Sequence, residues 1–262
     1  MPYSEWSGVK THYEVSGEGY PLVLVHANPF DRRMFLYQVA HFSTFVKVIN
    51  IDLRGYGYSD KPARSISMTD LCSDVVAVCR QEAVREAVFL GVSVGGVMGL
   101  NLGLDHPEIF KALILVGCSS QPGDRYRTRI DGYLQQGVAP YHVRHLTDLV
   151  SGGFPQTSLG KYLLGMQTEM DTRLSAPAIA EIFHALQNRD FTARLPELKM
   201  PVVVINGEFD NSLPRSREMA KNIAGAEHHV ISGAGHACGL EDPAAFDAIV
   251  MGFLKKHKFI DG

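Results

Sequence analysis

The sequence predicts an α/β fold in which a mostly parallel sheet carries helices on both faces and a helical cap is inserted. Short uninterrupted apolar runs, such as residues 21–26 and 200–207, alternate with helical patterns along most of the chain. Strands of a parallel sheet produce such runs because helices cover both of their faces. The interval from about residue 120 to 196 contains only helical patterns separated by glycine and proline, which indicates an insertion.

The elements follow one another in a regular strand–helix order. We expect strands at 9–15, 21–26, 45–53, 87–92, 111–117, 200–207 and 227–232. Residues 9–15 alternate between apolar and polar side chains, which is typical of an edge strand. We expect helices at 67–84, 94–106, 214–225 and 242–257. Ser67 opens the first of them, because its hydroxyl suits a helix N-cap.

This order divides the chain into two parts. We expect residues 1–119 and 197–262 to form the core domain and residues 120–196 to form a cap inserted into it. An independent second domain is the alternative, but the boundaries lack a long linker rich in proline and serine. A cap between two strands of one sheet is expected to lie over the strand ends, where open α/β sheets bind ligands.

Charge and composition argue against several classes of function. The net charge of -3 gives no basic surface for nucleic acid or an anionic membrane. The four cysteines lack CxxC spacing and the first residues lack a signal peptide, so we expect free thiols in a cytoplasmic protein. No GxGxxG follows the first strand. His142 and His145 have helical spacing but no nearby third ligand, so neither a metal nor another cofactor is expected.

Ser93 lies in the stretch Gly91-Val92-Ser93-Val94-Gly95, between a predicted strand and a predicted helix. A sharp strand-to-helix turn forces its central residue into a rare backbone conformation, and flanking glycines relieve the crowding. That geometry presents the serine hydroxyl above the sheet edge and points the Val94 N–H toward the same place. A helix-capping serine is the alternative. The position between clear elements favours a nucleophile.

A serine nucleophile needs a histidine base and a carboxylate that orients it. His236 follows the last predicted strand in a loop of small residues, and Asp210 follows the strand before it. The chain order serine, aspartate, histidine fits this architecture. Glu208 is the alternative acid, but Asp210 lies further beyond the strand end and is therefore favoured.

The oxyanion that develops during acyl transfer needs two hydrogen-bond donors. The Val94 N–H is the first expected donor. The loop after the strand at 21–26 reads HANPF, and the Asn28 N–H in this loop is the expected second donor. A simple turn before proline is the plainer interpretation of Asn28, and it is compatible with the donor role.

Five motifs occur in one order along the chain: VHANPF, IDLRGYGYSDKP, GVSVGG, GEFD and GAGHACGLEDP. With them the chain resembles the α/β-hydrolase superfamily over essentially its whole length. The resemblance implies that Ser93, Asp210 and His236 form a catalytic triad and that the helical interval caps the site. Ala27 replaces the commoner glycine of the first motif, which leaves the backbone donors intact. The form His-x-Asn-Pro is also similar to haloalkane dehalogenases and epoxide hydrolases, but their nucleophile is aspartate.

The expected function is a cofactor-independent serine hydrolase that cleaves carboxylic esters or lactones through an acyl-enzyme on Ser93. Two alternatives remain: a hydrolase of C–C bonds in diketone or dienoate substrates, and a small-molecule sensor that keeps the triad. Phe30, Tyr133 and Tyr141 are candidate substrate-binding residues, although cap aromatics at helical spacing are more often core. The expected partner is a small ester or lactone, and the residues indicate no oligomeric state.

Overall fold

The computed structural model describes residues 2–169 and 171–261. Its centre is an eight-stranded sheet with the order β1-β2-β4-β3-β5-β6-β7-β8. Strands β3 to β8 run parallel, whereas β1 and β2 pair antiparallel and β2 pairs antiparallel with β4. The strands are β1 Tyr3–Trp6, β2 Val9–Ser16, β3 Pro21–Val25, β4 Lys47–Ile51, β5 Ala87–Val92, β6 Phe110–Val116, β7 Val202–Gly207 and β8 Glu227–Ile231. The predicted α/β class is confirmed.

One edge of the sheet differs from the sequence-based expectation. Residues 9–15 are predicted as the edge, but β1 pairs outside β2, with Tyr3 opposite His12 and Trp6 opposite Val9. Because β1 has only four residues, three of them exposed, it carries no apolar pattern that would mark it as a strand. The interior strands behave as predicted, since β5 and β7 are buried at every position.

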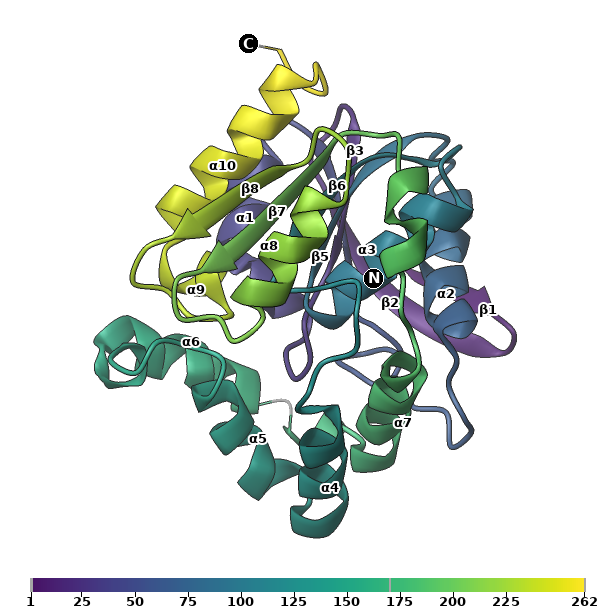
Figure 1. Ribbon diagram of the computed structural model, residues 1–262. Coiled ribbons are helices and arrows are strands. Elements are labelled where there is room, and N and C mark those ends of the chain that lie inside the picture. The colour runs from purple at the N-terminus through teal and green to yellow at the C-terminus, as the bar shows by residue number, and fades with distance from the viewer. Residues whose placement is uncertain (1, 170, 262) are drawn as a thin grey trace.

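Helices cover both faces of the sheet (Figure 1). Side chains of β3 alternate between the faces, so Val23 joins the apolar cluster that includes α2 and α3, and Leu24 joins the one that includes α1 and α10. Ser67 caps α2 as predicted, in a capping box with Asp70. The covering helices are α1 Leu36–Phe42, α2 Met68–Gln81, α3 Val94–Asp105, α8 Leu213–Lys221, α9 Cys238–Glu241 and α10 Pro243–Lys256.

Four more helices lie between β6 and β7 in the chain, where the sequence predicts an inserted helical region. They are α4 Tyr126–Gln136, α5 Val138–Thr147, α6 Ser158–Thr168 and α7 Ala176–Gln187. Figure 1 shows them gathered beyond the carboxyl ends of β7 and β8. Ile130 and Ile179 of this region belong to the same apolar cluster as Met98 of α3, so the insertion packs directly on the sheet domain. Short 3-10 segments occur at Arg32–Phe35, Phe154–Gln156, Asp171–Arg173 and Thr192–Glu197.

The cysteines match the expectation of free thiols, because Cys72, Cys79, Cys118 and Cys238 are all buried and unpaired. Burial raises the pKa of each thiol, so none is activated as a nucleophile. In the described part of the chain, every helix is too short or too polar to span a bilayer.

Candidate active site

Ser93 stands at the turn between β5 and α3, in a backbone conformation that is rare for a residue with a side chain. Its φ of 54° and ψ of -109° lie in a region that favours glycine. A Cβ atom on Gly91 would lie 2.2 Å from the Gly95 oxygen, and one on Gly95 would lie 2.3 Å from the Val25 oxygen. Both glycines are therefore required for the turn. The Ser93 side chain makes no capping hydrogen bond to α3, which argues against the helix-cap alternative.

Asp210 and His236 meet beyond the ends of β7 and β8. His236 Nδ1 donates to Asp210 Oδ1 across 2.9 Å, and the side chains are 13% and 1% exposed, respectively. Three further donors hold the carboxylate: the Ser212 N–H and Asn206 Nδ2, each at 2.8 Å, and the Ser212 hydroxyl at 2.9 Å. The carboxylate is therefore held in place by the protein itself and can orient the imidazole.

This contact shifts the pKa of both partners. Burial alone would raise the pKa of Asp210, but His236 and the hydrogen bonds from Ser212 and Asn206 hold it well below its usual range. Burial alone would lower the pKa of His236, but the Asp210 carboxylate outweighs burial and raises the pKa above 6.5. Asp210 is thus ionised at neutral pH and strengthens the histidine as a proton acceptor.

Glu208, the alternative acid, lies elsewhere. Its side chain is exposed and accepts hydrogen bonds from the Ser232 hydroxyl at 2.9 Å and from the Gly233 N–H at 2.8 Å. These contacts tie Glu208 to the turn after β8. The structure therefore brings Asp210, and not Glu208, to His236.

Gly117 lies directly against this pair and was not singled out from the sequence. It follows β6 with a φ of +57°, and a Cβ atom there would lie 2.8 Å from His236 Cε1 and 3.1 Å from Asp210 Oδ2. A side chain at this position would displace the imidazole. The available signal was a glycine directly after an apolar strand at the sheet edge where Ser93 and Asp210 were expected.

The loop after β3 brings Asn28 to the site. Asn28 is 3% exposed, and its Oδ1 accepts a hydrogen bond of 2.6 Å from the Tyr56 hydroxyl. Its Nδ2 has no hydrogen-bond partner among the described residues, although Asn28 lines the cavity described below. Val94, whose N–H is the other expected donor, is the first residue of α3 and follows Ser93 directly. Asn28 and Ser93 thus line the same cavity, and Val94 is the next residue in the chain; the oxyanion role of the two N–H groups stays a prediction.

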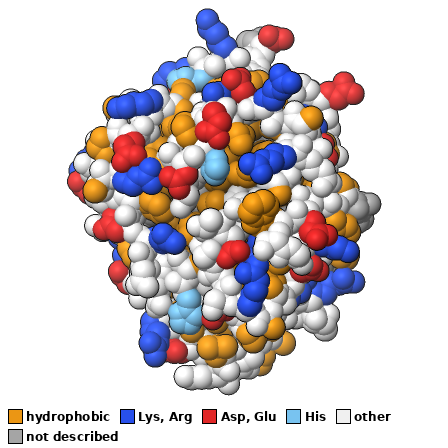
Figure 2. All heavy atoms as spheres, turned by 90° about the vertical axis from the view of Figure 1, so that its right-hand side faces the viewer, with side chains coloured by type: hydrophobic (Ala, Val, Ile, Leu, Met, Phe, Trp, Pro, Cys, Tyr) orange, Lys and Arg blue, Asp and Glu red, His pale blue; other side chains and the backbone are white. Residues whose placement is uncertain are grey.

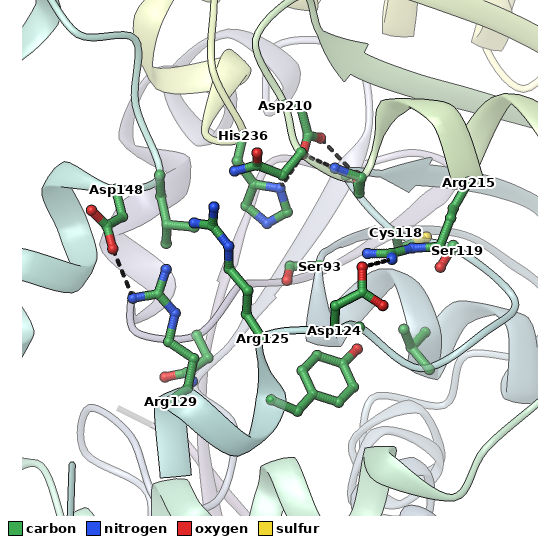
Figure 3. Close-up of a pocket in the computed structure, with 18 of the residues that line it drawn as sticks. Ser93, Cys118, Ser119, Asp124, Arg125, Arg129, Asp148, Asp210, Arg215 and His236 are labelled. Atoms are coloured by element: carbon green, nitrogen blue, oxygen red, sulfur yellow. Dashed lines mark hydrogen bonds and ion pairs between the residues drawn. The ribbon is translucent and has the colours of Figure 1, made fainter. Parts of the chain in front are cut away.

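The candidate catalytic residues share one cavity of about 290 Å³, which residues of the sheet domain and of the inserted helices line together. Figure 3 shows Ser93 at its floor, with His236 and Asp210 to one side. No hydrogen bond joins Ser93 to His236 among the described residues; such bonds often tighten only when substrate binds. The inserted region contributes Tyr126, Arg129, His145, Leu149 and Phe183 to the lining.

Phe30, Tyr133 and Tyr141, the candidate substrate-binding residues, do not line this cavity. Phe30 is fully buried in the apolar cluster that includes α1 and α10. The rings of Tyr133 and Tyr141 pack edge to face at 4.9 Å inside the inserted helical region, between α4 and α5. The aromatic side chains that reach the cavity are Tyr126 and Phe183. The structure therefore places the three candidates in the core.

The two cap histidines have different surroundings. His145 lines the cavity, and its Nδ1 lies 3.0 Å from the Tyr133 hydroxyl. Burial is the main cause that keeps the pKa of His145 well below 6.5, and the positive charge of Arg129 lowers this pKa further. His142 is buried and bonds to Asp171 through Nδ1. Within residues 2–169 and 171–261, no group of three or more His, Cys, Asp or Glu side chains is placed to hold a metal ion.

The fold and this site define an α/β hydrolase. Residues 22–249 match the model of the alpha/beta hydrolase family, and the chain belongs to that family. This result confirms the resemblance carried by the five sequence motifs.

Relatives cover almost the whole chain at low identity. The chain is 25% identical to 3-oxoadipate enol-lactonase 2 of Acinetobacter baylyi, over 95% of this chain and 94% of the relative. It is 27% identical to 2-hydroxymuconate semialdehyde hydrolase of Pseudomonas sp. strain CF600, over 95% and 91% of the two chains. Among solved structures, the enol-lactonase from Burkholderia xenovorans LB400 superposes with a TM-score of 0.91 at 25% identity, covering 97% of this chain and 100% of the other.

Proposed function

We propose that this protein is a serine hydrolase that cleaves carboxylic esters or lactones through an acyl-enzyme on Ser93. The observation that carries the proposal is the strained turn of Ser93, which opens into the same cavity as the His236–Asp210 pair. Similarity to an enol-lactonase supports the choice of esters and lactones. The buried free thiols agree with a cytoplasmic location, which belongs to the same proposal.

The proposed reaction begins when Ser93 Oγ attacks the carbonyl carbon of the substrate. His236 Nε2 accepts the hydroxyl proton, while Asp210 holds Nδ1–H and stabilises the imidazolium that forms. The N–H groups of Val94 and Asn28 are assigned to the oxyanion. His236 then returns the proton to the leaving oxygen, which stays attached to the acyl chain when the substrate is a lactone. Water, activated by His236, releases the acid and restores Ser93.

The second candidate reaction is C–C bond hydrolysis of a diketone or dienoate. The 27% identity to a hydrolase named for 2-hydroxymuconate semialdehyde, itself a dienoate, favours it. The same nucleophile and base would serve both reactions, so substrate preference separates them. A sensor role would instead give slow turnover with ligand-dependent binding of a protein partner.

Two measurements test the proposal. A fluorophosphonate should label Ser93 and no other serine, as mapped by peptide mass spectrometry, and Ser93→Ala should remain unlabelled. The values of kcat/KM for a butyrate ester, a γ- or δ-lactone and a vinylogous diketone are then compared. We expect the ester or lactone to be the best substrate. A diketone rate about a hundredfold higher than both, equal to about 2.7 kcal/mol of transition-state preference, would establish the C–C hydrolase instead.

A further inference from the structure

One basic side chain at the cavity has no acidic partner. Its lining contains three aspartates and three arginines: Asp124, Asp148, Asp210, Arg125, Arg129 and Arg215. Each aspartate has a basic partner, because Asp210 contacts His236, Asp148 accepts from Arg129, and Asp124 pairs with Arg215. The Arg125 side chain makes no hydrogen bond or ion pair with any described residue. One guanidinium group at the cavity is therefore left without a counter-charge.

Arg125 is the N-cap residue of α4, and Arg129 lies in the first turns of the same helix. They are four residues apart in the chain, and both line the cavity. Figure 3 shows the Arg125 side chain extending from the start of α4 toward His236, with Arg129 beside it. Arg127 lies between them in sequence, but its side chain is 77% exposed and pairs with Asp131 outside the cavity. The helix start thus presents two of its three arginines to the site.

Arg129 can bind the same anion as Arg125. Its side chain is only 8% exposed, and its Nη1 donates to Asp148 Oδ2 at 3.0 Å and to the Tyr141 hydroxyl at 3.4 Å. These bonds use one of its three nitrogens, which leaves Nε and Nη2 without a partner among the described residues. Because Asp148 is itself 39% exposed, water screens part of its charge. The Arg129 guanidinium therefore keeps donors for a further anion.

We propose that Arg125 and Arg129 bind a carboxylate carried by the substrate, distinct from the carbonyl group that Ser93 attacks. The natural substrate is thus an acidic ester or lactone, a class that the cavity of about 290 Å³ can hold. Guanidinium groups bind carboxylates through paired N–H donors that fix orientation as well as charge. This inference rests on the proposed serine-hydrolase function and specifies its substrate.

The test compares esters that differ only in a terminal methyl or carboxylate. Monomethyl succinate, glutarate and adipate are each measured against methyl butyrate, valerate and hexanoate, respectively. We expect kcat/KM for at least one acidic ester to exceed that of its neutral match by about tenfold, as charge-assisted hydrogen bonds allow. The preference should shrink as sodium chloride increases, because salt screens an exposed guanidinium.

The matched variants are Arg125→Gln and Arg127→Gln, which remove one charge each from the same exposed helix start. Arg125→Gln should lower kcat/KM for the preferred acidic ester about tenfold more than for its neutral match, mainly through KM. Arg127→Gln should leave the ratio between the two esters at the wild-type value. Circular dichroism verifies that both variants are folded.

The experiments distinguish failure of the carboxylate site from failure of the proposed hydrolase function. If neutral esters are cleaved as well as acidic ones and Arg125→Gln leaves their ratio unchanged, the carboxylate site is wrong while the hydrolase stands. If no ester of either series is cleaved and the fluorophosphonate does not label Ser93, the proposed function itself fails.

Discussion

The Tyr56 hydroxyl donates a hydrogen bond of 2.6 Å to the side-chain oxygen of Asn28. Both residues are buried, Tyr56 completely, so this bond determines which way the Asn28 amide faces. Its Oδ1 is used by Tyr56, and its Nδ2 has no partner among the described residues at the wall of the cavity. Tyr56 is therefore a positioning residue for the loop that carries the expected oxyanion donor.

Tyr56→Phe tests this relationship. The change leaves Asn28 Oδ1 buried without a donor, so we expect a loss of about 1–2 kcal/mol in the free energy of unfolding. We also expect kcat for a short ester to fall about tenfold, because even a small misplacement of a group that acts on the transition state lowers the rate. Urea denaturation and initial rates measure the two effects. Tyr58→Phe is the control, because Tyr58 contacts arginines through its ring face rather than Asn28; equal effects of the two changes would refute the positioning role.

The strained turn predicts a difference between two inactive variants. Ser93→Ala and Ser93→Gly both remove the nucleophile, so each should lower kcat by on the order of 10³ or more. Alanine retains the unfavourable φ of 54°, whereas glycine relieves it. We therefore expect the glycine variant to be more stable by about 1 kcal/mol, after the greater flexibility of its unfolded chain is counted. Chemical denaturation of both variants measures this; equal stability would contradict strain at Ser93.

The acid of the triad is tested by comparing two carboxylates on the same loop. Asp210→Asn should lower kcat by on the order of 10³, and His236→Ala should lower it further, because the acid orients the base without itself exchanging the proton. Glu208→Gln should change kcat by less than about twofold, since its exposed side chain bonds only to the turn after β8. A severe Glu208→Gln with a mild Asp210→Asn would reverse the assignment.

The candidate triad could be predicted because its signals are local. Glycines on both sides of Ser93 and the ends of two apolar strands indicate the turn and the loops, whatever the rest of the chain does. Parallel strands then bring those loops to one edge of the sheet. The same reasoning missed Gly117, because its role depends on a contact with His236 that no neighbouring residue signals.

The lining from the cap could not be predicted in the same way. Tyr133 and Arg129 lie on one helix, yet only Arg129 reaches the cavity, while Tyr133 packs on Tyr141. Which helix face turns inward depends on how α4 packs between α5 and α7, and periodicity alone does not distinguish a core face from a cavity face. The edge strand β1 was missed for a related reason, since four mostly exposed residues carry no burial pattern.

Gly117→Ala should damage catalysis more than folding. The added Cβ would lie 2.8 Å from His236 Cε1 and would force the imidazole to move. Moving the imidazole from its catalytic position is expected to lower kcat by about a hundredfold. The positive φ of residue 117 is expected to cost the alanine variant about 1–2 kcal/mol of stability. Gly165→Ala is the control, because a Cβ there meets nothing within 4 Å in an exposed turn of α6. An unchanged kcat for Gly117→Ala would mean that His236 does not depend on this close approach.

The pH dependence follows from the shifted pKa values of the pair. His236 must be neutral to accept the Ser93 proton, so kcat/KM should rise with pH, with a midpoint above 6.5 because the Asp210 carboxylate outweighs burial. In Asp210→Asn, burial and the Arg129 charge remain and both lower the His236 pKa, so the residual activity should have its midpoint at a lower pH.

The same pair predicts how stability depends on pH. The raised pKa of His236 contributes stability that is fully present below its unfolded pKa and is lost as pH rises through its folded pKa. The depressed pKa of Asp210 contributes stability that is lost only as pH falls through its folded value, far below neutrality. The advantage of wild type over Asp210→Asn in the free energy of unfolding should therefore be larger at pH 6 than at pH 9. Urea denaturation at the two pH values measures it, and an advantage that grew toward pH 9 would contradict a charged His236–Asp210 pair.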